Sequence, residues 1–139
     1  MRIGGADRPC HSLGVTPAIR LLICEDDPRV RQTLSRVAGS QADLEVVAAV
    51  ERGEDAIDAV LESRADVIVL DVHLPGIDGI EVIRRLRDQG VATPILVLSA
   101  DDRAATRIEG LGKVKFLSKG ATGALDVLAA IRCSAASAS

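Results

Sequence analysis

Short apolar runs alternate with stretches of helical spacing along the central part of the chain. The runs cover Leu21 to Cys24, Leu44 to Val50, Val67 to Leu70, Ile95 to Leu98 and Val114 to Leu117. Their length and their Val, Ile and Leu content are typical of strands that are covered on both faces. Because a helix-like stretch follows every run, the pattern predicts an α/β fold, in which five parallel strands alternate with five helices that cover both faces of the sheet.

Capping residues and apolar spacing refine where the helices lie. The residues expected to cap a helix at its start are Asp27, Asp78 and Thr122. The last helix is expected over Ala124 to Arg132, and its core-facing stripe is expected to be Leu125, Leu128 and Ile131. These signals place helix starts directly after the first, third and fifth strands.

The length and hydropathy of the chain limit it to one folded unit. It has 139 residues, of which 47% are hydrophobic, and no apolar run approaches the ~20 residues that cross a bilayer. Residues 1 to 18 are rich in glycine and proline and are expected to form a disordered leader. Residues 134 to 139 contain only Ser and Ala and are expected to form a frayed end or the start of a linker. No contact with a membrane is expected.

Composition argues against direct nucleic-acid binding by this segment. Phe116 is the only aromatic residue and the formal net charge is -3, so both base stacking and electrostatic capture of phosphates are disfavoured. Three cysteines without a CxxC spacing suit the reducing cytoplasm, where we expect the protein to reside. Cys24 falls inside the first apolar run and is expected to be a buried hydrophobe.

Polar residues that follow different strands are expected to meet at one edge of the sheet. In parallel sheets the carboxyl ends of the strands share an edge, and ligands bind there. The residues concerned are Glu25, Asp26, Asp71, Ser99 and Lys119. Three neighbouring carboxylates repel one another, and a divalent cation relieves that repulsion. Since Mg²⁺ prefers oxygen ligands, the cluster predicts a magnesium site.

Four motifs in this order resemble the receiver domain of two-component response regulators. They are the acidic pair Glu25-Asp26, the stretch Leu70-Asp-Val-His-Leu-Pro-Gly-Ile-Asp-Gly79, the pair Ser99-Ala100, and Phe116-Leu-Ser-Lys119. The resemblance covers residues 19 to 133. It implies a three-layer flavodoxin-like (βα)5 fold with strand order 2-1-3-4-5.

The resemblance also implies the roles of the metal and of the nucleophile. Asp71 would accept a phosphoryl group from a sensor histidine kinase or a phosphotransfer protein. Asp26 would bind Mg²⁺ directly, Glu25 would hold a metal-bound water, and Asp71 and the backbone carbonyl of His73 would complete the protein ligands. The side chain of His73 is expected to face solvent.

Two residues that follow the fourth and fifth strands would contact the phosphoryl oxygens. By the same resemblance these are Ser99 and Lys119. After phosphorylation Ser99 would turn toward Asp71, and Phe116 would move from an exposed position into the space that Ser99 leaves. Phe116 fits a place in the core equally well.

The fourth helix departs from the family pattern. The segment between Ser99 and Lys119 is shorter than is usual, and residues 101 to 109 offer only about two turns before Gly110 and Gly112. We therefore expect a shortened fourth helix, with Ile108 and Leu111 as its apolar anchors. Receivers usually change shape and form homodimers through this element, so its shortening bears directly on the output surface.

Three functions remain open at this level. The leading one is a phosphorylated switch, not an enzyme, that controls an output such as transcription, because residues 43 to 56 look like receivers joined to a helix-turn-helix DNA-binding domain. The second is a degenerate receiver that serves only as a protein-interaction module. The third is a metal-dependent phosphatase, which usually has a second acid two residues after the nucleophile, where this chain has His73.

Overall fold

Five parallel strands form one sheet in the order β2-β1-β3-β4-β5 in a computed structural model that describes residues 17–108 and 110–137. The strands are β1 (Ile19–Cys24), β2 (Leu44–Val50), β3 (Val67–Leu70), β4 (Ile95–Ser99) and β5 (Val114–Ser118). The helices are α1 (Pro28–Gly39), α2 (Gly53–Ser63), α3 (Gly79–Asp88), α4 (Ala104–Arg107) and α5 (Ala124–Ser137). The predicted fold class and strand order are confirmed.

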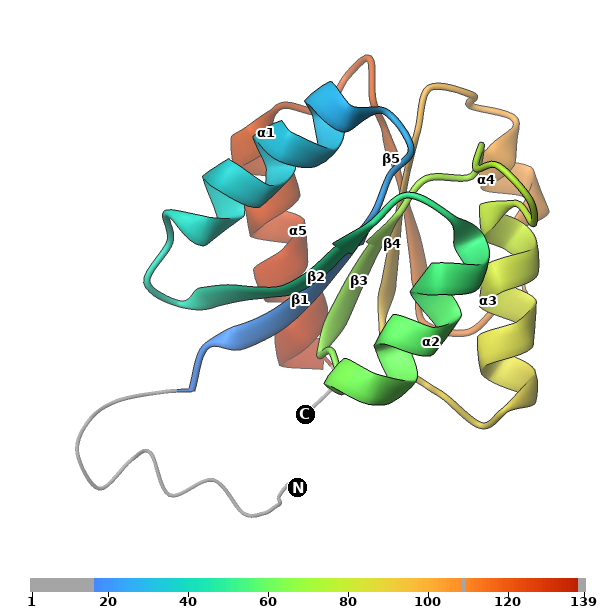
Figure 1. Ribbon diagram of the computed structural model, residues 1–139. Helices are drawn as coiled ribbons and strands as arrows, with labels where there is room; N and C mark the ends of the chain where they lie inside the picture. Colours follow the sequence, from blue (N-terminus) through green and yellow to red (C-terminus); the bar gives the residue numbers. More distant parts are fainter. Residues whose placement is uncertain (1–16, 109, 138–139) are drawn as a thin grey trace.

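The sheet separates two hydrophobic cores, because successive strand side chains point to opposite faces. In β1, Leu22 and Cys24 join the core under α2, α3 and α4, whereas Leu21 and Ile23 join the core under α1 and α5. Figure 1 shows the same three layers, with α1 and α5 on one face and α2 to α4 on the other. Cys24 is buried as predicted, and burial, followed by the nearby carboxylate of Asp71, raises the pKa of its thiol to about 12.

Two of the predicted helix caps are present. The Asp27 carboxylate accepts a hydrogen bond from the Arg29 backbone N–H at 2.9 Å, and the Asp78 carboxylate accepts one from the Glu81 N–H at 2.9 Å. Each bond satisfies a backbone donor that has no partner within the helix. Both caps lie in loops at the carboxyl edge of the sheet, so they fix the path of the loops that carry the acidic residues.

Helix α5 begins at Ala124 as expected, but its capping, its core-facing residues and its end differ from the sequence-based expectation, which placed the cap at Thr122. The Gly123 N–H donates to the Asp126 carboxylate at 3.1 Å, so the side chain of Asp126, in the first turn, satisfies a backbone donor at the start of this helix. Leu125 is 80% exposed, and its prediction as a core residue was wrong. The helix presents Val127, Leu128, Ala130 and Ile131 to the core, because the stripe begins one turn later than expected. It also continues through Ser137, beyond the expected end at Arg132.

The far end of α5 lies against the amino edge of the sheet. Arg132 makes an ion pair with Asp43, which directly precedes β2, at 2.7 Å. The Arg132 side chain also donates to the Gln41 side-chain carbonyl at 3.0 Å. These contacts fix the last turns of α5 beside the loop that enters β2.

The shortened fourth helix is confirmed, since α4 has only four residues. Ile108 is buried and Leu111 packs against the core under α2, α3 and α4, as predicted. Two polar contacts, one with the residue that caps α3 and one with α3 itself, hold the segment in place. Arg107 pairs with Asp78 at 3.1 Å, and the Arg87 guanidinium donates to the Gly112 carbonyl at 2.7 Å.

In the part of the chain that the structure describes, no helix has both the length and the apolar character needed to span a bilayer. Most of the expected leader, residues 1 to 16, lies outside the described residues. Residues 134 to 137 belong to α5, whereas residues 138 and 139 lie outside the described part.

Candidate metal centre

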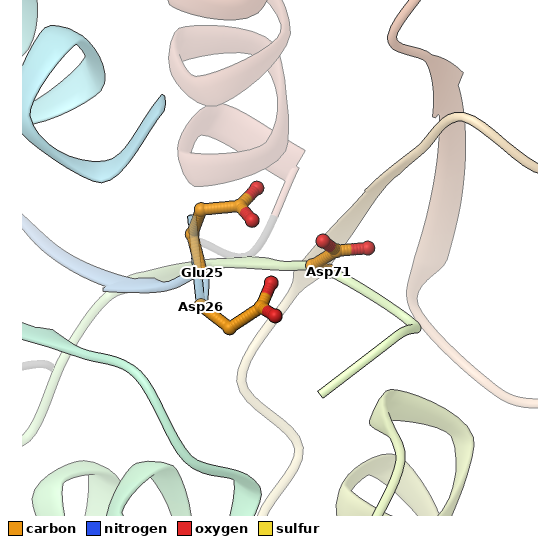
Figure 2. Close-up of side chains that lie close together, drawn as sticks. All are labelled: Glu25, Asp26 and Asp71. Carbon is orange, nitrogen blue, oxygen red and sulfur yellow. The ribbon is translucent and has the colours of Figure 1, made fainter. Parts of the chain in front are cut away.

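Three carboxylates converge at the carboxyl edge of the sheet. Glu25 and Asp26 follow β1, and Asp71 follows the neighbouring strand β3, whose Leu70 pairs with Cys24. One carboxylate oxygen from each acid lies within 4.8 Å of the others, and Figure 2 shows the three side chains gathered around one space. The predicted meeting of these residues therefore occurs, and it follows from the pairing of β1 with β3.

Lys119 supplies the positive charge of this cluster. Its ammonium lies 2.7 Å from a Glu25 carboxylate oxygen and 3.0 Å from Asp71 Oδ2. The Lys119 backbone N–H donates to the Ser99 carbonyl at 2.9 Å, which extends the pairing of β4 and β5 to this residue. This backbone pairing places the Lys119 side chain so that it crosses the end of β4 toward β3 and β1.

Burial disfavours the charged forms of the residues in this cluster. Glu25 and Asp71 are buried, whereas Asp26 is exposed. Burial, reinforced by the neighbouring Asp71, raises the pKa of Glu25 to about 7, although the bond from Lys119 opposes this rise. Burial acts to lower the pKa of Lys119, but its hydrogen bonds to Glu25 and Asp71 outweigh burial and raise it. A second positive charge among these acids would therefore be stabilised.

The donor atoms of the cluster fit Mg²⁺. Three carboxylates provide hard oxygen ligands, and the exposed Asp26 keeps one side open to water, which Mg²⁺ retains in its shell. The His73 backbone N–H donates to Asp71 Oδ1 at 3.2 Å, so the backbone of His73 lies beside the Asp71 carboxylate. A metal-ligand role for the His73 carbonyl stays a prediction.

Ser99 and Phe116 lie where the strand pattern places them, on β4 and β5. Ser99 is fully buried, and its hydroxyl accepts a hydrogen bond from the Asp101 N–H at 3.1 Å. Phe116 is half-buried and packs against the core under α2, α3 and α4, so the exposed starting position expected of a switch residue is not observed. Alternation along β5 points the ring to this face. The ring is only half-buried because β5 is an edge strand and α4 has only four residues.

The sequence did not reveal two side-chain contacts between the loop after Asp71 and the α4 segment. His73 Nε2 lies 3.6 Å from an Asp101 carboxylate oxygen, and Arg107 pairs with Asp78. The His73 side chain is exposed, as expected. Spacing along the chain carries no signal for such pairs, because they depend on how the α4 segment lies over the loop.

Gly79 allows the loop after Asp71 to pack tightly, and its replacement by alanine is expected to destabilise the fold. A Cβ at this position would overlap the Asp71 carbonyl oxygen and lie 2.9 Å from the Val72 Cα. Backbone atoms cannot rotate away, so Gly79→Ala should lower the free energy of unfolding by about 1–3 kcal/mol, measured by urea denaturation.

Gly39→Ala is the matched control for this prediction. A Cβ at Gly39, the last residue of α1, meets nothing within 4 Å. Alanine should be tolerated there, or stabilise the helix by up to about 1 kcal/mol. Equal stability of the two variants would contradict the close packing inferred at Gly79.

Residues 21–131 match the family model of the response regulator receiver domain. The chain therefore belongs to the family of response regulator receiver domains. It is 41% identical over 122 residues to the transcriptional regulatory protein TcrA of Mycobacterium tuberculosis, covering 86% of this chain and 46% of the relative. It is 40% identical over 93 residues to the response regulator MprA of Mycolicibacterium vanbaalenii, covering 67% of this chain and 39% of the relative. The chain thus spans less than half the length of these relatives.

Solved receiver domains share the architecture. The signal receiver domain of the putative response regulator NarL from Mycobacterium tuberculosis superposes with a TM-score of 0.80 at 25% identity, covering 86% of this chain and 98% of that one. The response regulator domain of CheB from Thermotoga maritima gives a TM-score of 0.75 at 28% identity, covering 86% and 97%. These similarities agree with the five-stranded parallel sheet of this chain and with its strand order.

Proposed function

We propose that this domain is a phosphorylated switch whose phosphoacceptor is Asp71. The observation that supports this proposal is the setting of the Asp71 carboxylate. It is buried at the end of β3, close to the carboxylates of Glu25 and Asp26, and 3.0 Å from the ammonium of Lys119. A buried carboxylate held beside an ammonium and a set of oxygen ligands suits a nucleophile that must meet an anionic donor.

The donor in this proposal is a phosphohistidine of a sensor histidine kinase or a phosphotransfer protein. A carboxylate oxygen of Asp71 forms a bond to phosphorus while the bond between phosphorus and the imidazole nitrogen breaks, and the electron pair stays on that nitrogen. When bound, Mg²⁺ supplies charge neutralisation on the phosphoryl oxygens. Glu25, Asp26, Asp71 and the carbonyl of His73 would hold the ion.

Lys119 and Ser99 would contact the transferred group. The ammonium of Lys119 already lies at Asp71 Oδ2, where it would meet a phosphoryl oxygen after transfer. Ser99 would turn its hydroxyl from the Asp101 backbone toward the new phosphoryl group. Loss of that bond, followed by a movement of Phe116 from its half-buried position, would carry the signal to α4 and β5.

The output of the proposed switch is control of transcription in the cytoplasm. Relatives carry names such as transcriptional regulatory protein and are more than twice as long as the matched segment. The net negative charge and the lack of aromatic residues other than Phe116 argue that DNA is contacted by another domain and not by this one. Homodimerisation would accompany phosphorylation.

The experiment that tests this function uses acetyl phosphate as a small acyl-phosphate donor. Incubation with Mg²⁺ should add one phosphate to the protein, detected by intact-mass spectrometry, and hydroxylamine should remove it because the product is an acyl phosphate. Removal of Mg²⁺ by EDTA should prevent the reaction. No modification of the folded protein by acetyl phosphate or by beryllofluoride would exclude the switch.

A second candidate is favoured by the four-residue α4, which is short for a signalling surface. In this alternative the domain binds a partner protein without being phosphorylated. Absence of phosphorylation, with Mg²⁺ binding and the fold intact, would support it. Rapid multiple turnover of phosphate esters would instead support a phosphatase.

A further inference from the structure

Arg31 connects the first turn of α1 to the backbone of both neighbouring acids. Its Nη1 donates to the Glu25 carbonyl at 2.8 Å and to the Asp26 carbonyl at 3.4 Å. Nη1 also lies 3.8 Å from a carboxylate oxygen of Glu51, which follows β2, and only 21% of the Arg31 side chain is exposed. One guanidinium thus links the loop after β1 to the loop after β2.

The loop after β1 has other restraints, but these leave the two carbonyls to Arg31. The Glu25 N–H donates to the Val50 carbonyl at 3.0 Å, and the Asp27 N–H donates to the Glu25 carboxylate at 3.1 Å. Both bonds use N–H donors of the loop. The carbonyl side of the peptides at residues 25 and 26 is held by the arginine, so their orientation depends on it.

We propose that Arg31 is a positioning residue of the magnesium site. The inference rests on the proposed function, because it assumes that Glu25 and Asp26 hold Mg²⁺. Rotation of the peptide between these residues would swing their carboxylates apart, and a hydrogen-bonded guanidinium opposes that rotation. Partners of this kind, which touch the ligands and not the metal, typically change metal affinity about 10–100-fold when removed.

The positive charge of Arg31 is expected to weaken Mg²⁺ binding, whereas its positioning of the ligands strengthens it. The direction in which the Mg²⁺ affinity changes when Arg31 is replaced therefore shows which effect is larger. A positive charge near the site repels Mg²⁺, so loss of charge alone would strengthen binding. Loss of positioning would weaken it. The proposal requires that the second effect is larger, because Mg²⁺ accepts little distortion of its octahedral shell.

Three variants separate these effects. Arg31→Gln removes the charge and shortens the side chain, whereas Arg31→Lys keeps the charge but reaches less far. Arg29→Gln is the matched control, because Arg29 lies exposed in the same turn of α1 and, among the described residues, its guanidinium makes no hydrogen bond or ion pair. Each variant is tested as the whole 139-residue chain.

Two measurements are made on each variant. Isothermal titration calorimetry with MgCl₂ gives the Kd, and hydrogen exchange of the Glu25 amide in metal-free protein reports the order of the loop. We expect Arg31→Gln to weaken Mg²⁺ binding about tenfold and to speed exchange at this amide, whereas Arg29→Gln leaves both unchanged. Arg31→Lys should recover part of the affinity.

The outcomes distinguish failure of this inference from failure of the proposed function. If the unmodified protein binds Mg²⁺ and Arg31→Gln binds it equally well or more tightly, Arg31 does not position the site. If the unmodified protein does not bind Mg²⁺ at millimolar concentration, the metal site itself is wrong. If Arg31→Gln fails to fold, as judged by circular dichroism, Arg31→Lys decides: weaker binding with its charge retained supports positioning, and unchanged binding overturns it.

Discussion

Replacement of Asp71 by asparagine is expected to abolish phosphorylation by acetyl phosphate. The amide has nearly the shape of the carboxylate, but it carries no negative charge and is a poor nucleophile toward phosphorus. Its carbonyl oxygen can still accept the hydrogen bond that the His73 N–H donates to Asp71 Oδ1. The variant should therefore fold while its intact mass stays unchanged after incubation with acetyl phosphate and Mg²⁺.

Asp102→Asn is the matched control for this experiment. Asp102 is an exposed acid in the loop after β4, so the substitution removes the same charge near the same edge of the sheet. This variant should gain one phosphate at the rate of the unmodified protein. Phosphorylation that persists in Asp71→Asn would show that another residue is the acceptor and would contradict the proposed function.

Replacement of Lys119 by glutamine should both destabilise the metal-free protein and slow phosphorylation. The change leaves the buried carboxylates of Glu25 and Asp71 facing each other without the ammonium that contacts both. Removing one partner of a fully buried ion pair costs about 3–5 kcal/mol, and about 2 kcal/mol is expected here because the lysine is partly exposed. Loss of a charge that stabilises the transferred phosphoryl group should slow the reaction about 100–1000-fold.

Magnesium distinguishes the two consequences of this change. A cation among the acids can replace the missing charge, so MgCl₂ should raise the Tm of Lys119→Gln more than that of the unmodified protein, while the phosphorylation rate stays low. Lys115→Gln, an exposed position on β5, serves as the control and should alter neither quantity. Equal rates for Lys119→Gln and the unmodified protein would rule out contact between Lys119 and the phosphoryl group.

The sheet and the acidic cluster could be predicted because both depend on local patterns. Apolar runs define the strands, and parallel pairing brings Glu25, Asp26 and Asp71 to one edge wherever the helices lie. The short α4 was also predictable, since it follows from the small number of residues between Ser99 and Lys119. Leu125 could not be placed correctly, because apolar spacing fixes the period of a helix but not the residue at which α5 first meets the core.

The polar contacts around the site depend on tertiary geometry. The contacts of Arg31 with the carbonyls of Glu25 and Asp26 need a particular angle between α1 and β1, and the pair between His73 and Asp101 needs the α4 segment to lie over the loop. Charged residues near turns are common, and most are solvated. The sequence therefore offers no means of choosing Arg31 over Arg29.

The ion pair between Arg132 and Asp43 determines how far from Asp71 any segment attached after α5 would lie. It fixes the last turns of α5 at the edge of the sheet where strands begin, while Asp71 lies where they end (Figure 1). A five-residue strand spans about 17 Å, so a group joined after α5 leaves the domain roughly that far from the Asp71 carboxylate. Under the proposed function, such a group would sense phosphorylation through movement of the body of the domain and not through contact with the Asp71 side chain.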